Sequence, residues 1–499
     1  MNKIHINHQG KTNIITAAPG ETILSVLTKQ GFHIPAPCGG NGTCGKCAVH
    51  TSEGVKLSCQ TTATDGLIIY PSKQECDAFA IQDTYESMRL LAHDRNGSYG
   101  IAIDIGTTTI AFELMGEGSK ICTYSKANSQ RSLGADVVTR IKQATEGASQ
   151  QLHTYIIDDI NHGIVQILKK SGISPEEIKT VAIAGNTTML HLLQNMPCHT
   201  LGVFPFTPVD IGIRRCTYKD IPLEKGQYNE PPALEEANTI ILPGISTFVG
   251  ADISAGILCC QSPGNTSPSL LIDLGTNGEM ALFAPGKVLT TSTAAGPAFE
   301  AGNISQGTAS IPGAIAKVRY LPETNVFVYE TIENQPPIGI CGTGVMDIAA
   351  ELIRHGLADE TGRLEDECFD NGVVIAEDIT FTQKDMREIQ LAKSSVRSGI
   401  EILLEVAGYG YNDIGMVFLA GGFGHKINME SAVTLGLIPP SLASKVVTVG
   451  NTSLGGAAHV LLSRKAEEDI IAIANIAKEI NLSTHPRFNE LFMEHMMFE

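Results

Sequence analysis

One stretch of the chain occurs twice, and this repeat constrains the fold more than any other feature. IAIDIGTTTIAFEL at 101–114 matches LLIDLGTNGEMALF at 270–283, because both have Ile-Asp, then Gly-Thr, then an apolar run. Both indicate a strand, a tight turn and a second strand, so each half has one such hairpin. After Gly100, apolar strands alternate with helix-length amphipathic segments, which is typical of an α/β architecture. The sequence predicts a duplicated α/β domain with lobes at 100–250 and 251–465.

The turns of the two hairpins have residues suited to phosphate. Asp104 and Asp273 each end the first strand, and a glycine with hydroxyl or amide residues follows. Such turns direct consecutive backbone N–H groups at an anion, while the carboxylate holds the waters around Mg²⁺. Two hairpins that face each other can bind β- and γ-phosphates from both sides. The candidate nucleotide-binding residues are Gly106, Thr107, Thr108, Thr109, Gly275, Thr276, Asn277 and Gly278.

Two further glycine-rich segments lie in the second half. FLAGGFGHKIN at 418–428 follows an apolar strand, and its glycines would let the backbone approach a flat adenosine group. ICGTGVMDIAAEL at 340–352 indicates a helix start where helices could cross closely. The glycines concerned are Gly421, Gly422 and Gly424 in the first segment and Gly342 and Gly344 in the second. The pattern GxxxxGK[ST] does not occur, which excludes a P-loop NTPase.

Four of the twelve cysteines are concentrated near the N-terminus, in the segment PCGGNGTCGKCAVHTSEGVKLSCQ. Four thiolates with glycines between them suit an iron–sulfur cluster, whose sulfides need backbone N–H donors at close range. Zinc is the weaker alternative, because four-cysteine zinc sites usually bring two short-spaced pairs and only one is present. The candidate metal ligands are Cys38, Cys44, Cys47 and Cys59. The other eight cysteines match no metal spacing, and we expect them to be buried thiols.

Residues 1–72 form a short module of their own. KIHINHQGKTNIITA indicates two strands around a Gln9-Gly10 turn, PGETILSVLTKQG a short helix, and KCAVHT, VKLSCQ and LIIYP further strands. The stretch 73–99 is polar and charged, so we expect a linker. A helical segment and a Met- and Phe-rich tail close the chain at 466–499. The sequence therefore predicts a small module, a linker, two lobes and a tail.

Two family resemblances follow from these motifs. Residues 1–72 resemble a [2Fe-2S] ferredoxin of β-grasp fold, with the five-residue first gap of the adrenodoxin-like branch, and the resemblance makes the four cysteines its ligands. Residues 100–465 resemble the ASKHA superfamily of actin, sugar kinases and heat-shock ATPases, which has a duplicated RNase H-like fold. This second resemblance implies ATP and Mg²⁺. It makes the two hairpins the phosphate-1 and phosphate-2 motifs, AGGFG the adenosine motif and GTG the connecting motif.

Asp252 is a further candidate catalytic residue beside Asp104 and Asp273. It lies at an expected helix start, 21 residues before Asp273, and related sugar kinases have a catalytic Asp in a similar place. There it could orient the attacking water, since phosphoryl transfer depends mainly on positioning and charge stabilisation. The alternative is a helix N-cap. Glu279 could take the same catalytic role.

The order ferredoxin then ASKHA, with AGNTTMLHLL at 184–193 and the tail STHPRFNELFMEHMMFE, resembles the reductive activators of corrinoid proteins. This resemblance implies ATP-dependent reduction of Co(II) corrinoid to Co(I) in a partner methyl-transfer protein. It also implies an external low-potential electron donor and a homodimer. Larger activators carry a middle domain, and here we expect only the linker at 73–99 in its place. The methyl donor stays open, since activators of methylamine methyltransferases carry C-terminal clusters and no cysteine follows Cys368.

Charge and hydropathy narrow the alternatives. The net charge of −18 argues against nucleic acid or anionic membranes as partners, because such binding depends on Lys and Arg. No 18-residue apolar run and no signal-peptide pattern occur. Since we expect the clustered cysteines to be thiolate ligands and not disulfides, we expect a cytoplasmic protein. Two rival functions stay open: an ASKHA phosphotransferase with a regulatory ferredoxin domain, and a non-catalytic nucleotide-binding redox sensor.

Overall fold

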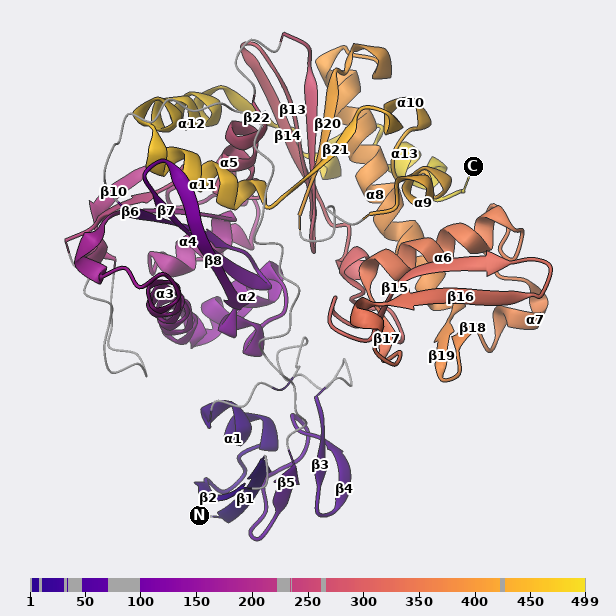
Figure 1. The fold of residues 1–499 in the computed structure, drawn as a ribbon, viewed down its shortest axis with the longest axis horizontal. Helices are drawn as coiled ribbons and strands as arrows, with labels where there is room; N and C mark the ends of the chain where they lie inside the picture. Colours follow the sequence, from indigo (N-terminus) through magenta and orange to yellow (C-terminus); the bar gives the residue numbers. More distant parts are fainter. Residues whose placement is uncertain are drawn as a thin grey trace.

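A computed structural model describes residues 2–8, 11–30, 34, 47–70, 99–221, 234, 236–261, 266–421 and 427–498. Figure 1 shows an N-terminal unit and two larger lobes, each built around a sheet. Across the described residues, none of the helices combines the length and apolar character that crossing a lipid bilayer needs.

The N-terminal unit is a five-stranded sheet with one helix. Its elements are β1 Asn2–His8, β2 Lys11–Ala17, α1 Ile23–Lys29, β3 Ala48–Thr51, β4 Gly54–Leu57 and β5 Ile68–Tyr70. The strand order is β2-β1-β5-β3-β4, with β1 and β5 parallel. Thr22 begins the helix by accepting the Ser25 N–H, and Leu27 packs in a core with Ile4 and Ile69. The predicted strands and helix are present, and the topology is that of a β-grasp.

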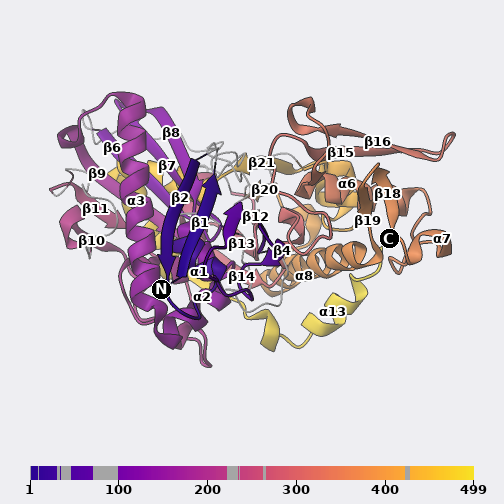
Figure 2. The same cartoon turned by 90° about the horizontal axis from the view of Figure 1, so that it is seen from below.

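The first lobe has a six-stranded sheet in the order β10-β11-β9-β6-β7-β8. The strands are β6 Tyr99–Ile105, β7 Thr109–Gly116, β8 Ser119–Ala127, β9 Ile178–Gly185, β10 Arg214–Thr217 and β11 Asn238–Ile241. The helices are α2 Val137–Gln143, α3 Ser149–Ser171, α4 Thr187–Leu193 and α5 Ala251–Cys260. Short helical turns are η1 Ser129–Ser132, η2 Ala144–Ala148, η3 Pro175–Glu177, η4 His199–Leu201 and η5 Tyr218–Asp220. The long helix α3 covers β7 and β8 (Figure 2).

The second lobe repeats this arrangement. Its sheet has the order β21-β20-β12-β13-β14-β22. The strands are β12 Ser269–Leu274, β13 Gly278–Ala284, β14 Lys287–Thr293, β20 Met416–Ala420, β21 Val446–Gly450 and β22 Ala477–Glu479. In both sheets an antiparallel three-stranded meander is followed by a strand parallel to its first strand, β9 beside β6 and β20 beside β12. The predicted duplication is therefore present in the strand topology as well as in the sequence.

An insertion between β14 and β20 enlarges the second lobe. Its strands are β15 Ala314–Leu321, β16 Val326–Thr331, β17 Gly339–Ile340, β18 Val373–Ala376 and β19 Ile379–Phe381. Its helices are η6 Pro297–Glu300, η7 Ile332–Asn334, α6 Gly342–Arg354, α7 Asp366–Phe369, α8 Gln383–Ala407 and η8 Tyr411–Asp413. After β20 come α9 Met429–Thr434, α10 Pro440–Ala443, α11 Thr452–Leu462, α12 Arg464–Ile476, η10 Leu482–Thr484 and α13 Phe488–Glu494. The tail is docked, since the Ser394 hydroxyl of α8 donates to the Phe492 carbonyl of α13 (Figure 2).

Helices α5 and α11 lie between the two sheets (Figure 1). Each follows the last parallel strand of its own repeat, yet α5 contacts β12 and β13 of the second sheet, and α11 contacts β6 and β9 of the first. The sequence assigns α11 to the lobe 251–465, whereas in the structure it packs on strands of the first lobe. Residues of both sheets therefore share one core, in which Ile103 and Ile183 cluster with Leu271 and Phe418.

The crossing of α5 and α11 depends on glycine. A Cβ atom on Gly456 would lie 2.2 Å from the Ala255 carbonyl oxygen, which no real side chain tolerates. We expect Gly456→Ala to lower the free energy of unfolding by about 1–3 kcal/mol, because the helices must separate. Differential scanning calorimetry should show a lower melting temperature. Gly410→Ala is the matched control, since its Cβ would meet only Asp413 at 3.7 Å, an ordinary contact; equal losses in both variants would contradict the prediction.

Candidate functional site

The first predicted phosphate turn follows β6. Asp104 lies near the strand end, and the Gly106 N–H donates to the Thr109 carbonyl at 2.9 Å, which closes the hairpin. A Cβ on Gly106 would lie 2.7 Å from the same oxygen, so this turn requires glycine. Thr108 accepts the Asn128 N–H through its carbonyl at 3.0 Å. The turn is therefore closed by its own hydrogen bond and also fixed by the backbone of Asn128, so its conformation is set before any anion binds.

Three side chains that the sequence did not predict brace this turn. Arg140 donates to the Thr107 carbonyl at 2.5 Å, and Asn128 Nδ2 donates to the Gly106 carbonyl at 2.9 Å. Asn186 Nδ2 donates to the Thr107 hydroxyl at 3.1 Å. Arg140 is fully buried, and burial lowers its pKa to about 9. Asn186 belongs to the AGNTTM segment, and its position directly after a strand and before a helix was the available signal.

The Asp104 carboxylate is bound by residues from the other end of the chain. Asn451 Nδ2 donates to Asp104 Oδ2 at 2.9 Å, and the Ser453 hydroxyl donates to Oδ1 at 2.7 Å. Burial raises the pKa of Asp104 above its ordinary value, although these two hydrogen bonds oppose the rise. Neither Asn451 nor Ser453 was predicted from the sequence as a site residue.

The second predicted phosphate turn follows β12, and its closing hydrogen bond spans one residue fewer than that of the first turn. The Gly275 N–H donates to the Asn277 carbonyl at 3.0 Å, and the Thr276 hydroxyl donates to Glu300 at 3.0 Å. Gly278 begins β13, and the strand register places Asp273 directly opposite Glu279. Paired residues of adjacent strands project on the same face of a sheet. Two carboxylates therefore stand side by side at this turn.

Four carboxylates gather where the two lobes meet, and we call them the interlobe site: Asp104, Asp252, Asp273 and Glu279. Burial, and after it the charges of Asp252 and Asp104, raise the pKa of Asp273 to about 8. Burial and then Asp104 raise the pKa of Asp252 to about 7. Burial, Asp252 and Asp273 raise the pKa of Glu279 well above its ordinary value. Neighbouring carboxylates oppose each other's ionisation, so the raised pKa values show that these four groups lie within electrostatic range of one another.

Asp252 occupies the first turn of α5 but is not its N-cap. Gly250 is the N-cap, with no side-chain cap, so the alternative prediction of an Asp252 cap is wrong in detail. The carboxylate does accept a hydrogen bond at the helix start, from the Ile253 N–H at 2.9 Å. Its electrostatic coupling to Asp104 places it in the interlobe site.

Gly421 brings the predicted adenosine segment to the second phosphate turn. It follows β20 with φ of +92°, a backbone conformation that favours glycine, and its N–H donates to the Gly450 carbonyl at 3.1 Å. A Cβ there would lie 2.4 Å from the Leu274 carbonyl and 2.7 Å from Asp273 Oδ1. The predicted neighbours Gly422 and Gly424 lie outside the described residues.

Gly342 and Gly344 begin α6, as predicted, but the close approach is of a different kind. A Cβ on Gly344 would lie 2.3 Å from the Ile315 carbonyl of β15, so the glycine lets the helix approach a strand. The expectation of a close helix crossing at this position is wrong. The described contacts of these two glycines do not include the interlobe site.

Two of the four predicted cluster ligands are described. Cys47 is buried and Cys59 is half-buried, and their sulfur atoms lie 3.2 Å apart, too far for a disulfide bond. Burial opposes ionisation of Cys47, but hydrogen bonds from the Cys59 and Ser58 groups outweigh it and lower the pKa of the thiol. A close pair of cysteines, of which one has a lowered pKa, fits an iron–sulfur ligand set. Cys38 and Cys44 lie outside the described residues.

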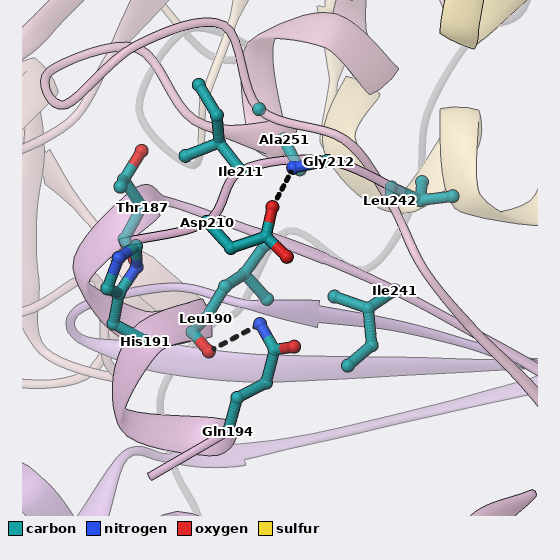
Figure 3. Close-up of a pocket in the computed structure, with 11 residues that line it drawn as sticks. Thr187, Leu190, His191, Gln194, Asp210, Ile211, Gly212, Ile241, Leu242 and Ala251 are labelled. Carbon is teal, nitrogen blue, oxygen red and sulfur yellow. Dashed lines mark hydrogen bonds between the residues drawn. The ribbon is translucent and has the colours of Figure 1, made fainter. Parts of the chain in front are cut away.

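A cavity next to Asp252 is too small for a substrate. Figure 3 shows it beneath α4, between Leu190, His191 and Gln194 on one side and Asp210 with Ala251 on the other. Its volume is about 10 Å³, near the least that holds one water molecule. A phosphotransferase would need room for an acceptor near Asp252, and this cavity does not provide it.

Comparisons with known families follow the order of the chain. Residues 6–66 match the 2Fe-2S iron-sulfur cluster binding domain, 99–262 the RACo middle region, and 267–499 the C-terminal domain of RACo, the ASKHA domain. The predicted fold class, a ferredoxin followed by an ASKHA fold, is confirmed. The expectation that only the linker 73–99 stands in place of a middle region is wrong, because the middle-region model matches the first lobe.

Individual relatives agree with the family models. The chain is 29% identical to the corrinoid activation enzyme RamQ of Eubacterium limosum, over 96% of each chain. It is 27% identical to the [Co(II) methylated amine-specific corrinoid protein] reductase of Methanosarcina barkeri, over 79% of this chain and 76% of the relative. Among solved structures, a reductive activator for corrinoid, iron-sulfur protein covers 100% of this chain and 98% of its own, with 25% identity and a TM-score of 0.71.

Proposed function

Because the chain belongs to the reductive activators of corrinoid proteins, we propose that it reduces the Co(II) corrinoid of a partner methyl-transfer protein to Co(I), with ATP hydrolysis. One electron passes in each activation. The main observation that supports the proposal is that one chain contains both a ferredoxin unit and the carboxylate-lined interlobe site. Each 100 mV of uphill transfer costs about 2.3 kcal/mol for one electron, a cost on the scale that ATP turnover can offset.

The N-terminal unit is proposed to carry the electron. Cys38, Cys44, Cys47 and Cys59 would hold a [2Fe-2S] cluster, which supplies one-electron transfer when bound. Cys47 and Cys59 support this, because their sulfurs are adjacent and unbridged. An external low-potential donor would be needed, since a cluster that has passed its electron to the corrinoid must be reduced again.

The interlobe site is proposed to bind Mg·ATP. Asp104 and Asp273 end equivalent strands of the two repeats, and each is followed by a tight turn whose N–H groups suit phosphate. Among the described residues, no three His, Cys, Asp or Glu side chains converge closely enough to hold a metal ion by themselves. Mg²⁺ keeps several of its waters and is usually held by one or two carboxylates together with substrate phosphates, so Asp104 and Asp273 would suffice as its protein ligands. Gly421 would let the backbone approach the adenosine, and Asp252 or Glu279 would orient the attacking water.

A reduction assay tests the proposed function. Chemically reduced protein, ATP and a purified corrinoid protein should give Co(I) by its absorbance, and omission of ATP should abolish the product. A phosphotransferase would instead yield a phosphorylated small molecule, and a redox sensor would show negligible ATP turnover. Absence of ATP-dependent Co(I) with corrinoid proteins from methyl-transfer systems of several methyl donors would contradict the proposal.

We also propose that the protein acts as a homodimer in the cytoplasm. Two-fold assemblies are the commonest among soluble oligomers, and the cysteine usage suits a reducing compartment. Light scattering during size-exclusion chromatography gives the mass directly. A mass of one 53.1 kDa chain would exclude the dimer.

A further inference from the structure

Helix α11 begins at the point where the chain leaves the second sheet. Gly450 ends β21 and accepts the N–H of Gly421, the described glycine of the adenosine segment, at 3.1 Å. Asn451 follows as the N-cap of α11, and its Oδ1 accepts the Leu454 N–H at 2.9 Å. The helix then packs on β6, the strand that carries Asp104. The consecutive elements β21 and α11 thus connect the adenosine segment to β6, the strand that precedes the first phosphate turn.

The contacts with Asp104 use both of its carboxylate oxygens. Oδ2 accepts from Asn451 and Oδ1 from Ser453, at 2.9 and 2.7 Å. Ser453 is buried, and in the described contacts its hydroxyl bonds only to this carboxylate. A carboxylate fixed at both oxygens has one orientation, since rotation about its terminal bond would break both hydrogen bonds.

The first repeat contains the same device. Asn186 follows β9 as the N-cap of α4, just as Asn451 follows β21 as the N-cap of α11, in the related segments AGNTTM and VGNTSL. Each asparagine accepts a backbone N–H of its own helix through Oδ1, which caps that helix. Each also donates through Nδ2 to the first phosphate segment, by which we mean residues 104–109: Asn186 to the Thr107 hydroxyl and Asn451 to the Asp104 carboxylate. One segment is therefore held by an N-cap asparagine from each repeat.

We propose that Asn451 and Ser453 are positioning residues, which orient Asp104 toward the hydrated magnesium of bound ATP and link it to the adenosine segment. The inference rests on the proposed Mg·ATP site. A movement of β21 on adenosine binding reaches Asp104 through one residue, because Asn451 is covalently joined to Gly450. The two asparagines make the orientation of the first phosphate segment depend on both repeats.

Nucleotide binding by the full-length protein tests this inference, independently of any reduction assay. ATP affinity is measured by titration calorimetry with excess Mg²⁺ and again with a chelator. In the wild type, Mg²⁺ should tighten ATP binding. In Ser453→Ala the increase in ATP affinity caused by Mg²⁺ should fall about tenfold, because one charge-assisted hydrogen bond to Asp104 is lost. ATP affinity without Mg²⁺ should stay unchanged. Ser453→Thr should restore the gain because it retains the hydroxyl.

Two more variants separate positioning from folding. Asn451→Asp keeps an N-cap but places a carboxylate against Asp104, so the Mg²⁺-dependent gain should fall at least as far. Thr452→Val is the matched control, since its hydroxyl is buried beside Ser453 and has no hydrogen-bond partner among the described residues. Equal weakening with and without Mg²⁺ in Ser453→Ala, or an equal effect of Thr452→Val, would overturn the inference. If ATP does not bind the wild type, the proposed function fails and not this inference alone.

Discussion

Replacement of Asp273 by asparagine is expected to lower ATP turnover by a factor of about 100 to 1,000, the usual loss when one preorganised charge at a phosphoryl-transfer site is removed. The neutral amide cannot hold the waters of Mg²⁺ as a carboxylate does. It also leaves Glu279, its cross-strand partner, without the neighbouring charge. Phosphate release at saturating Mg²⁺ and ATP measures the effect on kcat.

The same variant is expected to stabilise the nucleotide-free protein. Burial, Asp252 and Asp104 raise the pKa of Asp273 from 3.8 to about 8 in the folded state. The folded protein therefore binds a proton that the unfolded chain has released, and its stability falls as pH rises from about 4 to about 8. Asparagine at 273 removes this penalty. Calorimetry should show a higher melting temperature than wild type at pH 8 and little difference at pH 4.5.

Asp370→Asn is the matched control for both measurements, because this carboxylate is exposed beyond α7 and away from the interlobe site. It should change neither turnover nor the pH dependence of melting. Wild-type turnover in Asp273→Asn, or a lower melting temperature at pH 8, would show that Asp273 is an ordinary structural residue.

Replacement of Cys47 by serine is expected to abolish Co(I) formation, with a loss of at least about 100-fold. A serine hydroxyl is a poor substitute for thiolate at iron, and Cys47 is buried beside Cys59, so the substitution removes one of two adjacent predicted ligands. The visible absorbance of the protein should fall together with its iron content. ATP turnover without a partner should be retained, since the interlobe site is built from residues 99–498.

Cys122→Ser gives the matched control for this substitution. Cys122 is a half-buried thiol on β8, remote in sequence from the ferredoxin unit, and burial raises its pKa. It should retain iron, colour and Co(I) formation. Full reductive activity in Cys47→Ser would exclude the predicted ligand set, whereas loss of ATP turnover in the same variant would indicate misfolding.

The features that the sequence predicts well are those determined by residues close together in the chain. The repeated sequence predicted both hairpin turns, because a tight Gly-Thr turn between two apolar strands has few alternative structures. The β-grasp unit followed from short alternating strands and one capped helix. The segment FVGADISAGIL predicted Asp252 at a helix start, where the structure has it in the first turn of α5. In each case, residues within about twenty positions determine the structure.

The features that the sequence did not predict depend on distant contacts. Ser453 meets Asp104 only because α11 crosses to the other repeat, and no local pattern encodes that crossing. Arg140 resembles an ordinary helical arginine until burial places it on the Thr107 carbonyl. Gly344 was predicted to serve a helix crossing, yet its neighbour is a strand. The insertion with β15 to β19 has no counterpart in the first repeat, so the duplication gave no information about it.

The exchange of α5 and α11 between the sheets has a consequence for cooperativity. Because one apolar core contains residues of both repeats, neither half can bury its surface alone, and separately expressed halves would each expose an aggregation-prone face. The ferredoxin unit has a core of its own. The polypeptide therefore divides into two cooperative units, a small one that can lose its structure and refold independently, and a large one that keeps or loses both repeats together.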